Sequence, residues 1–251
     1  MSRIKFLNTQ IDNITMQEAI NRIDELVIAN KNSYVVTPNV DHIVKLETDT
    51  ELKKIYKDAD LILTDGMPLI WISKLKFTPI KEKISGSDLF PRVCELAAHK
   101  GYKIFLLGAA EGVAKIAAKN LVDKYHGLNV VGTYSPSYGF ENNEEEINYI
   151  INLINKCSPD ILAVGLGAPK QEKFIYKYKD ELKVPVSLAI GASIDFEAGK
   201  IKRAPLYMQK SGLEWLYRLC KEPRRMFKRY LIDDMKIIKI TLKYNKFKEG
   251  L

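Results

Sequence analysis

The sequence predicts an α/β protein in which an open, mostly parallel sheet with helices on both faces precedes a basic helical appendage. Short apolar runs alternate with segments of helical periodicity, which is typical of βα units. The chain has 251 residues, enough for one large domain or a domain with an appendage. Its charge is uneven. Residues 200–251 hold 15 Lys and Arg against 5 Asp and Glu, a net charge of +10, whereas residues 1–199 have a net charge of −2.

Five apolar runs are each followed by turn-forming residues, and we expect them to be buried parallel strands. In chain order they are Tyr34–Val36, Leu61–Leu63, Ile104–Leu107, Ile161–Val164 and Val186–Ile190. Helical periodicity is clear over Glu111–Lys124 and Asn143–Cys157. Residues 1–199 therefore resemble a Rossmann-like domain, in which ligands bind beyond the carboxyl ends of the strands.

Residues 200–251 form the predicted appendage. Pro205 and Pro223 should divide it into separate helices, because proline is rarely tolerated inside a helix. Aromatic and aliphatic side chains are interspersed with its cations between Trp215 and Leu231. Basic and aromatic residues at helical spacing favour an anionic, partly apolar surface, such as a membrane with anionic lipid. We therefore expect the appendage to associate with a membrane, and the protein to self-associate when no membrane is present.

The cysteines and the N-terminal segment indicate the compartment. Cys94, Cys157 and Cys220 lie far apart among apolar neighbours, so we expect buried free thiols and a reducing, cytosolic environment. The first 15 residues contain no long apolar run, so we expect no signal peptide. No apolar stretch approaches the roughly 20 residues that span a bilayer, so any membrane contact should be peripheral.

Asp65, between Thr64 and Gly66, follows a predicted strand and is the candidate general base. A carboxylate in a cleft can accept a hydroxyl proton, although an aspartate before glycine is also a common turn residue. Asp58-Ala59-Asp60 resembles a metal-binding DxD, but it precedes its strand, so we expect solvated loop acids there. No other acidic or histidine cluster has metal-ligand spacing, and we predict neither a metal nor a cofactor.

Two glycine loops are candidate phosphate sites. Gly108 follows the third predicted strand and opens a loop that could cradle a phosphate or could simply form a tight turn. The segment Gly165–Glu172 includes Gly167, and it offers the Lys170 charge and the Gln171 amide to a phosphate or sugar. The alternative for this second loop is a solvated helix start.

The remaining polar candidates carry less specific signals. We expect an ordinary surface or capping role for His42, His99 and His126, and no Ser-His-Asp arrangement is visible. The appendage arginines offer bidentate hydrogen bonds to a pyrophosphate or else form a solvated helix face. They are Arg218, Arg224, Arg225 and Arg229.

Nine segments, taken in order, resemble glycosyltransferase family 26, the WecG/TagA/CpsF group. They are Thr37-Pro38-Asn39, Asp65-Gly66, Ser85–Leu89, Phe105–Gly108, Gly165–Glu172, Gly191–Phe196, Arg203-Ala204-Pro205, Gly212–Leu219 and Glu222–Arg225. The resemblance extends from about Val35 to Tyr230. The sequence GLEWLYRL, followed by EPRR, is its most specific part.

The resemblance implies a metal-independent, inverting transferase at the cytoplasmic face of the bacterial membrane. It implies transfer of a sugar, N-acetylmannosamine as first choice, from a UDP donor to N-acetylglucosamine on undecaprenyl pyrophosphate, in teichoic acid linkage-unit synthesis. UDP-N-acetylmannosaminuronic acid and UDP-glucose are alternative donors.

The resemblance also assigns roles to individual residues. It implies that Asp65 is the base, with Thr37 and Gln171 beside it, and that Asn39 and Asp195 lie near the donor. We expect Arg218, Arg224 and Arg225 to reach the lipid pyrophosphate when the appendage folds over the site at the membrane.

Two positions depart from the family pattern. Phe174 replaces a common tryptophan, and Lys83 stands where arginine is frequent, so its role toward a phosphate stays open. Outside the family, a Rossmann-type oxidoreductase is disfavoured because no strand is followed by a full GxGxxG. A nucleic-acid binder is disfavoured because it would leave the sheet motifs idle, so we expect no nucleic-acid partner.

Overall fold

Six parallel strands form the central sheet of the computed structural model, which describes residues 3–221 and 223–244 without the side chains of Lys210, Arg225, Arg229 and Leu231. In spatial order the strands are β4 (Leu61–Ile62), β3 (Ser33–Val36), β8 (Val186–Ala189), β7 (Ile161–Gly165), β5 (Lys103–Gly108) and β6 (Asn129–Tyr134). The predicted α/β fold and the five predicted strands are confirmed.

The sequence prediction missed three strands. β6 is an edge strand whose residues are exposed or half-buried, so it lacks the continuous apolar run of its neighbours. β1 (Arg3–Phe6) and β2 (Thr9–Asp12) form a separate antiparallel hairpin. Asp12 joins this hairpin to the sheet, because its carboxylate accepts hydrogen bonds from Arg3 and from the Ile62 backbone N–H.

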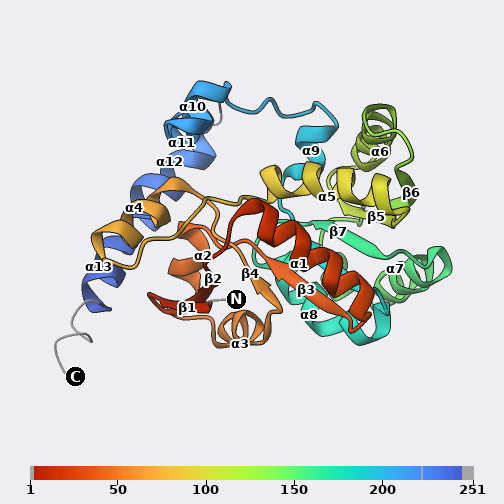
Figure 1. Cartoon of the computed structure of the whole chain (residues 1–251), viewed down its shortest axis with the longest axis horizontal. Coiled ribbons are helices and arrows are strands. Elements are labelled where there is room, and N and C mark those ends of the chain that lie inside the picture. The colour runs from red at the N-terminus through yellow and green to blue at the C-terminus, as the bar shows by residue number, and fades with distance from the viewer. Residues whose placement is uncertain (1–2, 222, 245–251) are drawn as a thin grey trace.

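Helices cover both faces of the sheet, as predicted (Figure 1). One face carries α1 (Met16–Ala29), α5 (Gly86–Lys100), α6 (Val113–Lys124) and α9 (Ser193–Glu197). The other carries α3 (Thr50–Asp58), α7 (Glu144–Cys157) and α8 (Lys170–Leu182). The short elements α2 (Val40–Lys45), α4 (Met67–Leu75) and η1 (Phe140–Asn142) connect them. Each face has its own apolar core, built from alternate residues of the strands.

The appendage consists of short helices, as the prolines predicted. They are α10 (Leu206–Lys210), α11 (Glu214–Lys221), α12 (Pro223–Lys228), the π-helix η2 (Arg229–Asp233) and α13 (Lys236–Lys243). Pro205 is the N-cap residue of α10, and Pro223 begins α12. Among the described residues, no helix has the length and apolar character needed to cross a bilayer.

The appendage packs against the body at both of its ends. Near its start, Ala204 is buried, and Arg203 forms an ion pair with Asp88. Near its end, Ile240 is buried in the core, and Lys243 forms an ion pair with Glu47 at 2.7 Å. The appendage is therefore attached to the body both near its start and near its end.

The prediction of three buried thiols is wrong for Cys220. Cys94 is buried, and its burial raises the pKa of its thiol, whereas Cys157 is half-buried. Cys220 is exposed because α11 buries none of its described residues, so the apolar neighbours of this cysteine are themselves at the surface.

Candidate active site

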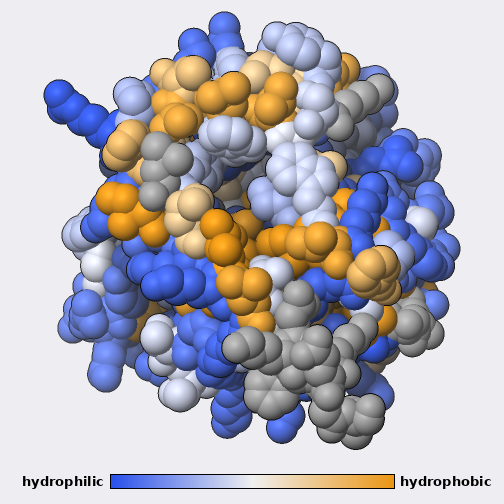
Figure 2. All heavy atoms as spheres, turned by 90° about the vertical axis from the view of Figure 1, so that its left-hand side faces the viewer, coloured by the Kyte–Doolittle hydropathy of each residue, from blue (hydrophilic) through white to orange (hydrophobic). Residues whose placement is uncertain are grey.

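A cleft with a volume of about 360 Å³ is lined by α4, by loops at the carboxyl edge of the sheet and by the appendage. It lies on the side of the molecule that faces the viewer in Figure 2. One part of its wall is polar and includes Asn39, Asp65, Lys83 and Arg218. Other lining residues are apolar or aromatic and come from α4, α11 and η2, among them Trp71, Trp215 and Tyr230. The cleft thus matches an amphiphilic ligand better than a wholly polar one.

Asp65 enters the cleft from the carboxyl end of β4. Its backbone N–H donates to the Pro38 carbonyl at 2.8 Å, and the following Gly66 adopts φ +99° to start α4. Burial raises the pKa of the Asp65 carboxyl, while Arg218 and Lys83 act in the opposite direction. The result is a carboxylate that holds a proton more tightly than a solvated aspartate, as a general base requires.

Lys83 is fixed at the rim of the cleft by Asp88. Its Nζ lies 2.6 Å from Asp88 Oδ2, which also accepts a hydrogen bond from Ser85. The other carboxylate oxygen of Asp88 pairs with Arg203 at 2.7 Å. These cations lower the pKa of Asp88 although its burial alone would raise it. Asp88 therefore holds Lys83, which lines the cleft, and Arg203, which lines the second cavity described next.

Arg218 connects the cleft with a second cavity of about 570 Å³. Its guanidinium lies 5.2 Å from the Phe196 ring centroid and 3.3 Å from Glu214. The second cavity is lined mainly by cations and two aromatic residues. These are Lys200, Lys202, Arg203, Arg218, Lys221, Phe196 and Tyr217. A cavity of this charge attracts an anionic group.

A buried polar network lies behind the cleft. His42 Nε2 is 3.3 Å from Glu172 Oε1, and His42 Nδ1 is 2.8 Å from the Asn39 side-chain oxygen. The Gln171 amide nitrogen donates to the same Glu172 oxygen, and the amide oxygen accepts from the Gly191 N–H. The network therefore joins the loops that follow β3, β7 and β8. Thr37 lies beside it, with its hydroxyl 3.4 Å from the Ala189 carbonyl oxygen.

The structure corrects one expectation and decides one open alternative. His42 is neither a surface residue nor only a cap, because it is 5% exposed and contacts Glu172 across 130 positions of the chain. The start of α8 is not a solvated helix, because Gln171 and Glu172 are buried. Only Lys170 faces outward, where it pairs with Glu141 at 2.6 Å.

The remaining predicted residues lie at the carboxyl edge of the sheet or on the appendage. Gly108 stands so close to Gly165 that a Cβ atom would lie 2.4 Å from the Gly165 carbonyl oxygen, so close packing alone requires glycine. Gly167 has φ +77° and open space around it, which leaves its backbone accessible. Asp195 lies in the first turn of α9.

The three appendage arginines that were expected to reach the lipid pyrophosphate differ in position. Arg218 lines the cleft, whereas Arg224 is exposed and lines neither cavity. The side chain of Arg225 lies outside the described part of the structure.

The family description "Glycosyl transferase WecG/TagA/CpsF family" matches residues 4–250. The chain belongs to this family. It is therefore a glycosyltransferase, and its carboxyl-edge cleft is the candidate site of sugar transfer.

Relatives within the WecG/TagA/CpsF family share its length. A protein of Bacillus spizizenii is 28% identical over 246 residues, which cover 98% of this chain and 91% of the relative. One of Bacillus subtilis is 32% identical over 177 residues, 70% of this chain and 67% of the relative. One of Staphylococcus aureus is 28% identical over 228 residues, 90% of this chain and 87% of the relative. All three are named N-acetylglucosaminyldiphosphoundecaprenol N-acetyl-beta-D-mannosaminyltransferase.

The structure adds residues to this family site that the sequence analysis did not select. Gln209, Glu214, Trp71 and Tyr230 line the cleft, and His42 and Glu172 support it from behind. The aromatic residues were visible in the sequence as an apolar pattern, but nothing in the pattern placed α4 opposite α11. Among the described residues, no group of three or more His, Cys, Asp or Glu side chains is arranged to hold a metal ion.

Proposed function

We propose that this glycosyltransferase moves N-acetylmannosamine from a UDP donor to N-acetylglucosamine on undecaprenyl pyrophosphate. The names of relatives that cover nearly the whole chain support this choice of substrates. The observation that carries the proposal is the cleft itself, which is lined by the Asp65 carboxylate with its raised pKa, by Lys83 and Arg218, and by apolar and aromatic side chains. Such a cleft suits an acceptor with a sugar, a pyrophosphate and a hydrocarbon chain.

In the proposed reaction, Asp65 removes the proton from the acceptor hydroxyl as that oxygen attacks the anomeric carbon of the donor sugar. The bond from this carbon to the UDP oxygen breaks on the opposite face, so the configuration inverts, and UDP leaves with the bonding electron pair. The raised pKa of Asp65 favours this step, because a more basic carboxylate takes the proton more readily.

In this proposal, protein cations and backbone N–H groups stabilise the negative charge on the departing UDP and on the lipid pyrophosphate. No metal takes part. Lys83 and Arg218 face the cleft, and the cationic second cavity adjoins it. We assign Asn39, Thr37, Gln171 and Asp195 to the donor side. We also assign to the donor side the exposed backbone of Gly167 and the residues Gly108 and Lys170, which lie at the carboxyl edge of the sheet.

The basic appendage is proposed to bind the cytoplasmic face of the membrane, where the lipid-linked acceptor resides. Its net charge of +10 attracts anionic lipid, and Arg224 is exposed to meet it. In this arrangement Arg224 and Arg225 act at the lipid surface, while Arg218 acts inside the cleft.

The decisive experiment is UDP release in EDTA, with UDP-N-acetylmannosamine and a pyrophosphate-linked N-acetylglucosamine acceptor. Wild type should turn over, and Asp65→Asn should lose about 10²–10⁴-fold in kcat, the range expected for a lost general base. Asp58→Asn is the matched control, because Asp58 is exposed at the end of α3 and its carboxylate accepts a hydrogen bond from Tyr176.

Equal turnover by wild type and Asp65→Asn would refute the assignment of the base. If the wild type fails with this donor but works with another UDP sugar, only the choice of donor is wrong.

A further inference from the structure

Three large apolar side chains protrude from the α/β body near the end of α4. Trp71 and Leu75 lie one helical turn apart and are 47% and 69% exposed, and Phe77, just after the helix, is 91% exposed. We call these three residues the body anchor. They belong to residues 1–199, not to the basic appendage. Packing in the core does not explain why large apolar side chains occur at these exposed positions.

The backbone at Phe77 also argues against a folding role. The Phe77 N–H donates to the Lys74 carbonyl and the Thr78 N–H to the Ser73 carbonyl, the hydrogen-bond pattern of a Schellman helix end. Phe77 occupies the left-handed position of this motif with φ +54°, where glycine is usual and other residues are strained. A bulky residue that is strained and almost fully exposed is better explained by function than by stability.

The body anchor adjoins the apolar surface of the appendage. A Cβ atom on Gly212, before α11, would lie 3.0 Å from the Trp71 ring. In Figure 1, α4 lies between α12 and α13, and Figure 2 shows hydrophobic atoms spread over this side of the molecule. The appendage contributes further large side chains that are at least half exposed. They are Leu206, Tyr207, Phe227, Ile232, Met235, Ile238 and Leu242.

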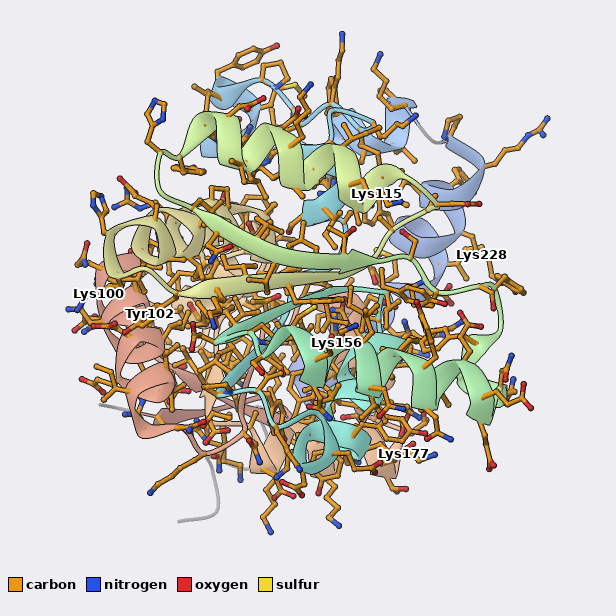
Figure 3. All side chains as sticks on the ribbon, turned by 90° about the vertical axis from the view of Figure 1, so that its right-hand side faces the viewer. Lys100, Tyr102, Lys115, Lys156, Lys177 and Lys228 are labelled. Atoms are coloured by element: carbon orange, nitrogen blue, oxygen red, sulfur yellow. The ribbon has the colours of Figure 1, made fainter. Side chains whose placement is uncertain are left out.

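The opposite side of the molecule has a different character. Figure 3 shows Lys115, Lys156 and Lys177 on the outer surfaces of α6, α7 and α8, pointing away from the sheet. Most of the exposed large apolar side chains lie on or just after α4 and on the appendage, together with the cations of the appendage and with Lys74 of α4, although α6 also exposes Ile116 and Val122 and α7 exposes Tyr149. Apolar and aromatic groups flanked by lysine and arginine fit an anionic phospholipid bilayer.

We propose that the body anchor inserts into the anionic membrane surface alongside the appendage. Trp71 both lines the cleft and is exposed, so the mouth of the cleft would open at the level of the lipid head groups. An acceptor anchored in the bilayer would then reach Asp65 without leaving the membrane. This inference rests on the proposed membrane association, but its test does not need catalytic activity.

The two tryptophans of the chain provide the first test. Trp215→Phe leaves Trp71 as the only tryptophan, and Trp71→Phe leaves Trp215. Each protein is mixed with phosphatidylcholine–phosphatidylglycerol vesicles whose acyl chains are brominated near the head group. We expect the emission of Trp71 to shift to shorter wavelength and to be quenched. Quenching of Trp215 alone would show that only the appendage enters the bilayer, and would overturn the proposal.

A matched pair of substitutions gives the second test. Leu75→Ser should weaken binding to these vesicles roughly tenfold, the loss expected when one large apolar side chain no longer leaves water. Ile28→Ser is the control, because Ile28 is 70% exposed but lies near the end of α1, away from α4. Equal vesicle affinity for both variants would overturn the proposal. So would a Leu75→Ser protein that loses self-association in sedimentation but keeps its vesicle affinity, because the face would then be a contact between copies.

Phe77→Gly separates membrane binding from folding. Glycine relieves the left-handed strain, so we expect the midpoint of thermal unfolding to rise by about 2 °C while vesicle affinity falls roughly tenfold. An unchanged affinity would refute the role of Phe77. UDP release with a short-chain, water-soluble acceptor is measured on the same proteins. Wild type that binds vesicles through Trp71 but releases no UDP would refute the proposed function and leave this inference intact.

Discussion

Asp65 lies where burial disfavours the charged form of its carboxyl group. Its carboxylate makes no side-chain hydrogen bond within the described part of the chain, and burial is the largest influence on its pKa. Lys83 and Arg218 compensate only in part, because the net effect is still a raised pKa. The folded protein therefore binds the Asp65 proton more tightly than the unfolded chain does. Ionisation of this residue reduces the free energy of unfolding as the pH rises through the window between the two pKa values.

This linkage predicts that Asp65→Asn stabilises the protein, although the same substitution should lower the rate of transfer. Asparagine cannot ionise, so at pH 7 the variant should have a higher free energy of unfolding than wild type in urea denaturation. The difference should shrink as the pH falls through the raised pKa, because the wild-type carboxyl then becomes protonated. Activity should follow the opposite trend, since a general base works deprotonated and wild-type turnover falls as the pH drops through the raised pKa. A variant less stable than wild type at pH 7 would mean that the Asp65 carboxylate contributes to folding.

Between elements, the contact of α4 with the start of α11 shapes the cleft. Gly212 allows it, because its φ is +76° and a Cβ atom there would lie 2.8 Å from Met67 and 3.0 Å from Trp71. Both neighbours line the cleft, so the close approach at Gly212 contributes to the packing of the appendage and to the shape of the site.

We therefore expect Gly212→Ala to displace α10 and α11 from α4 and to lower turnover of a membrane-embedded acceptor roughly tenfold, as overpacking commonly costs 1–3 kcal/mol. The appendage should also become more sensitive to limited proteolysis. Gly199→Ala is the matched control, since Gly199 has a similar φ of +71° and no atom within 4 Å of a Cβ position. Similar losses in both variants would attribute the effect to backbone strain, not to the α4 contact.

At the scale of the whole molecule, the body supplies nearly all of the apolar core and the appendage supplies most of the net positive charge. Of the buried residues in the two apolar cores, only Ile240 comes from the described part of the appendage. The positive charge is distributed in the opposite way, with a net charge of +10 on residues 200–251 and −2 on the rest. The body should therefore fold without the appendage, while strong membrane binding should require it.

Deletion of residues 200–251 is expected to leave a folded body that binds anionic vesicles only weakly, through the body anchor. Transfer to a membrane-embedded acceptor should fall by at least 10²-fold, because Arg218 and one wall of the cleft are lost. Circular dichroism and UDP release check the two parts of this prediction. Unchanged activity on the embedded acceptor would show that the appendage is dispensable for catalysis.

Local patterns in the sequence were enough to predict the fold class, five of the six sheet strands and the helix breaks in the appendage. Buried parallel strands are continuous apolar runs, and proline acts on its own backbone, so both signals lie within a few residues. Because these signals are local, they miss features that depend on distant parts of the chain, and this explains the wrong predictions. β6 is an edge strand without such a run, and Cys220 has apolar neighbours that do not face a core.

The sequence by itself determined which polar residues follow the strands, and therefore that Asn39, Asp65 and Gln171 would meet at the carboxyl edge of a parallel sheet. Only the tertiary structure decided what surrounds them. The contact of His42 with Glu172 spans 130 positions, and the apposition of Trp71 with Gly212 joins the body to the appendage. The position of each strand and the docking of each helix depend on how whole faces pack together. No local pattern of residues contains that information.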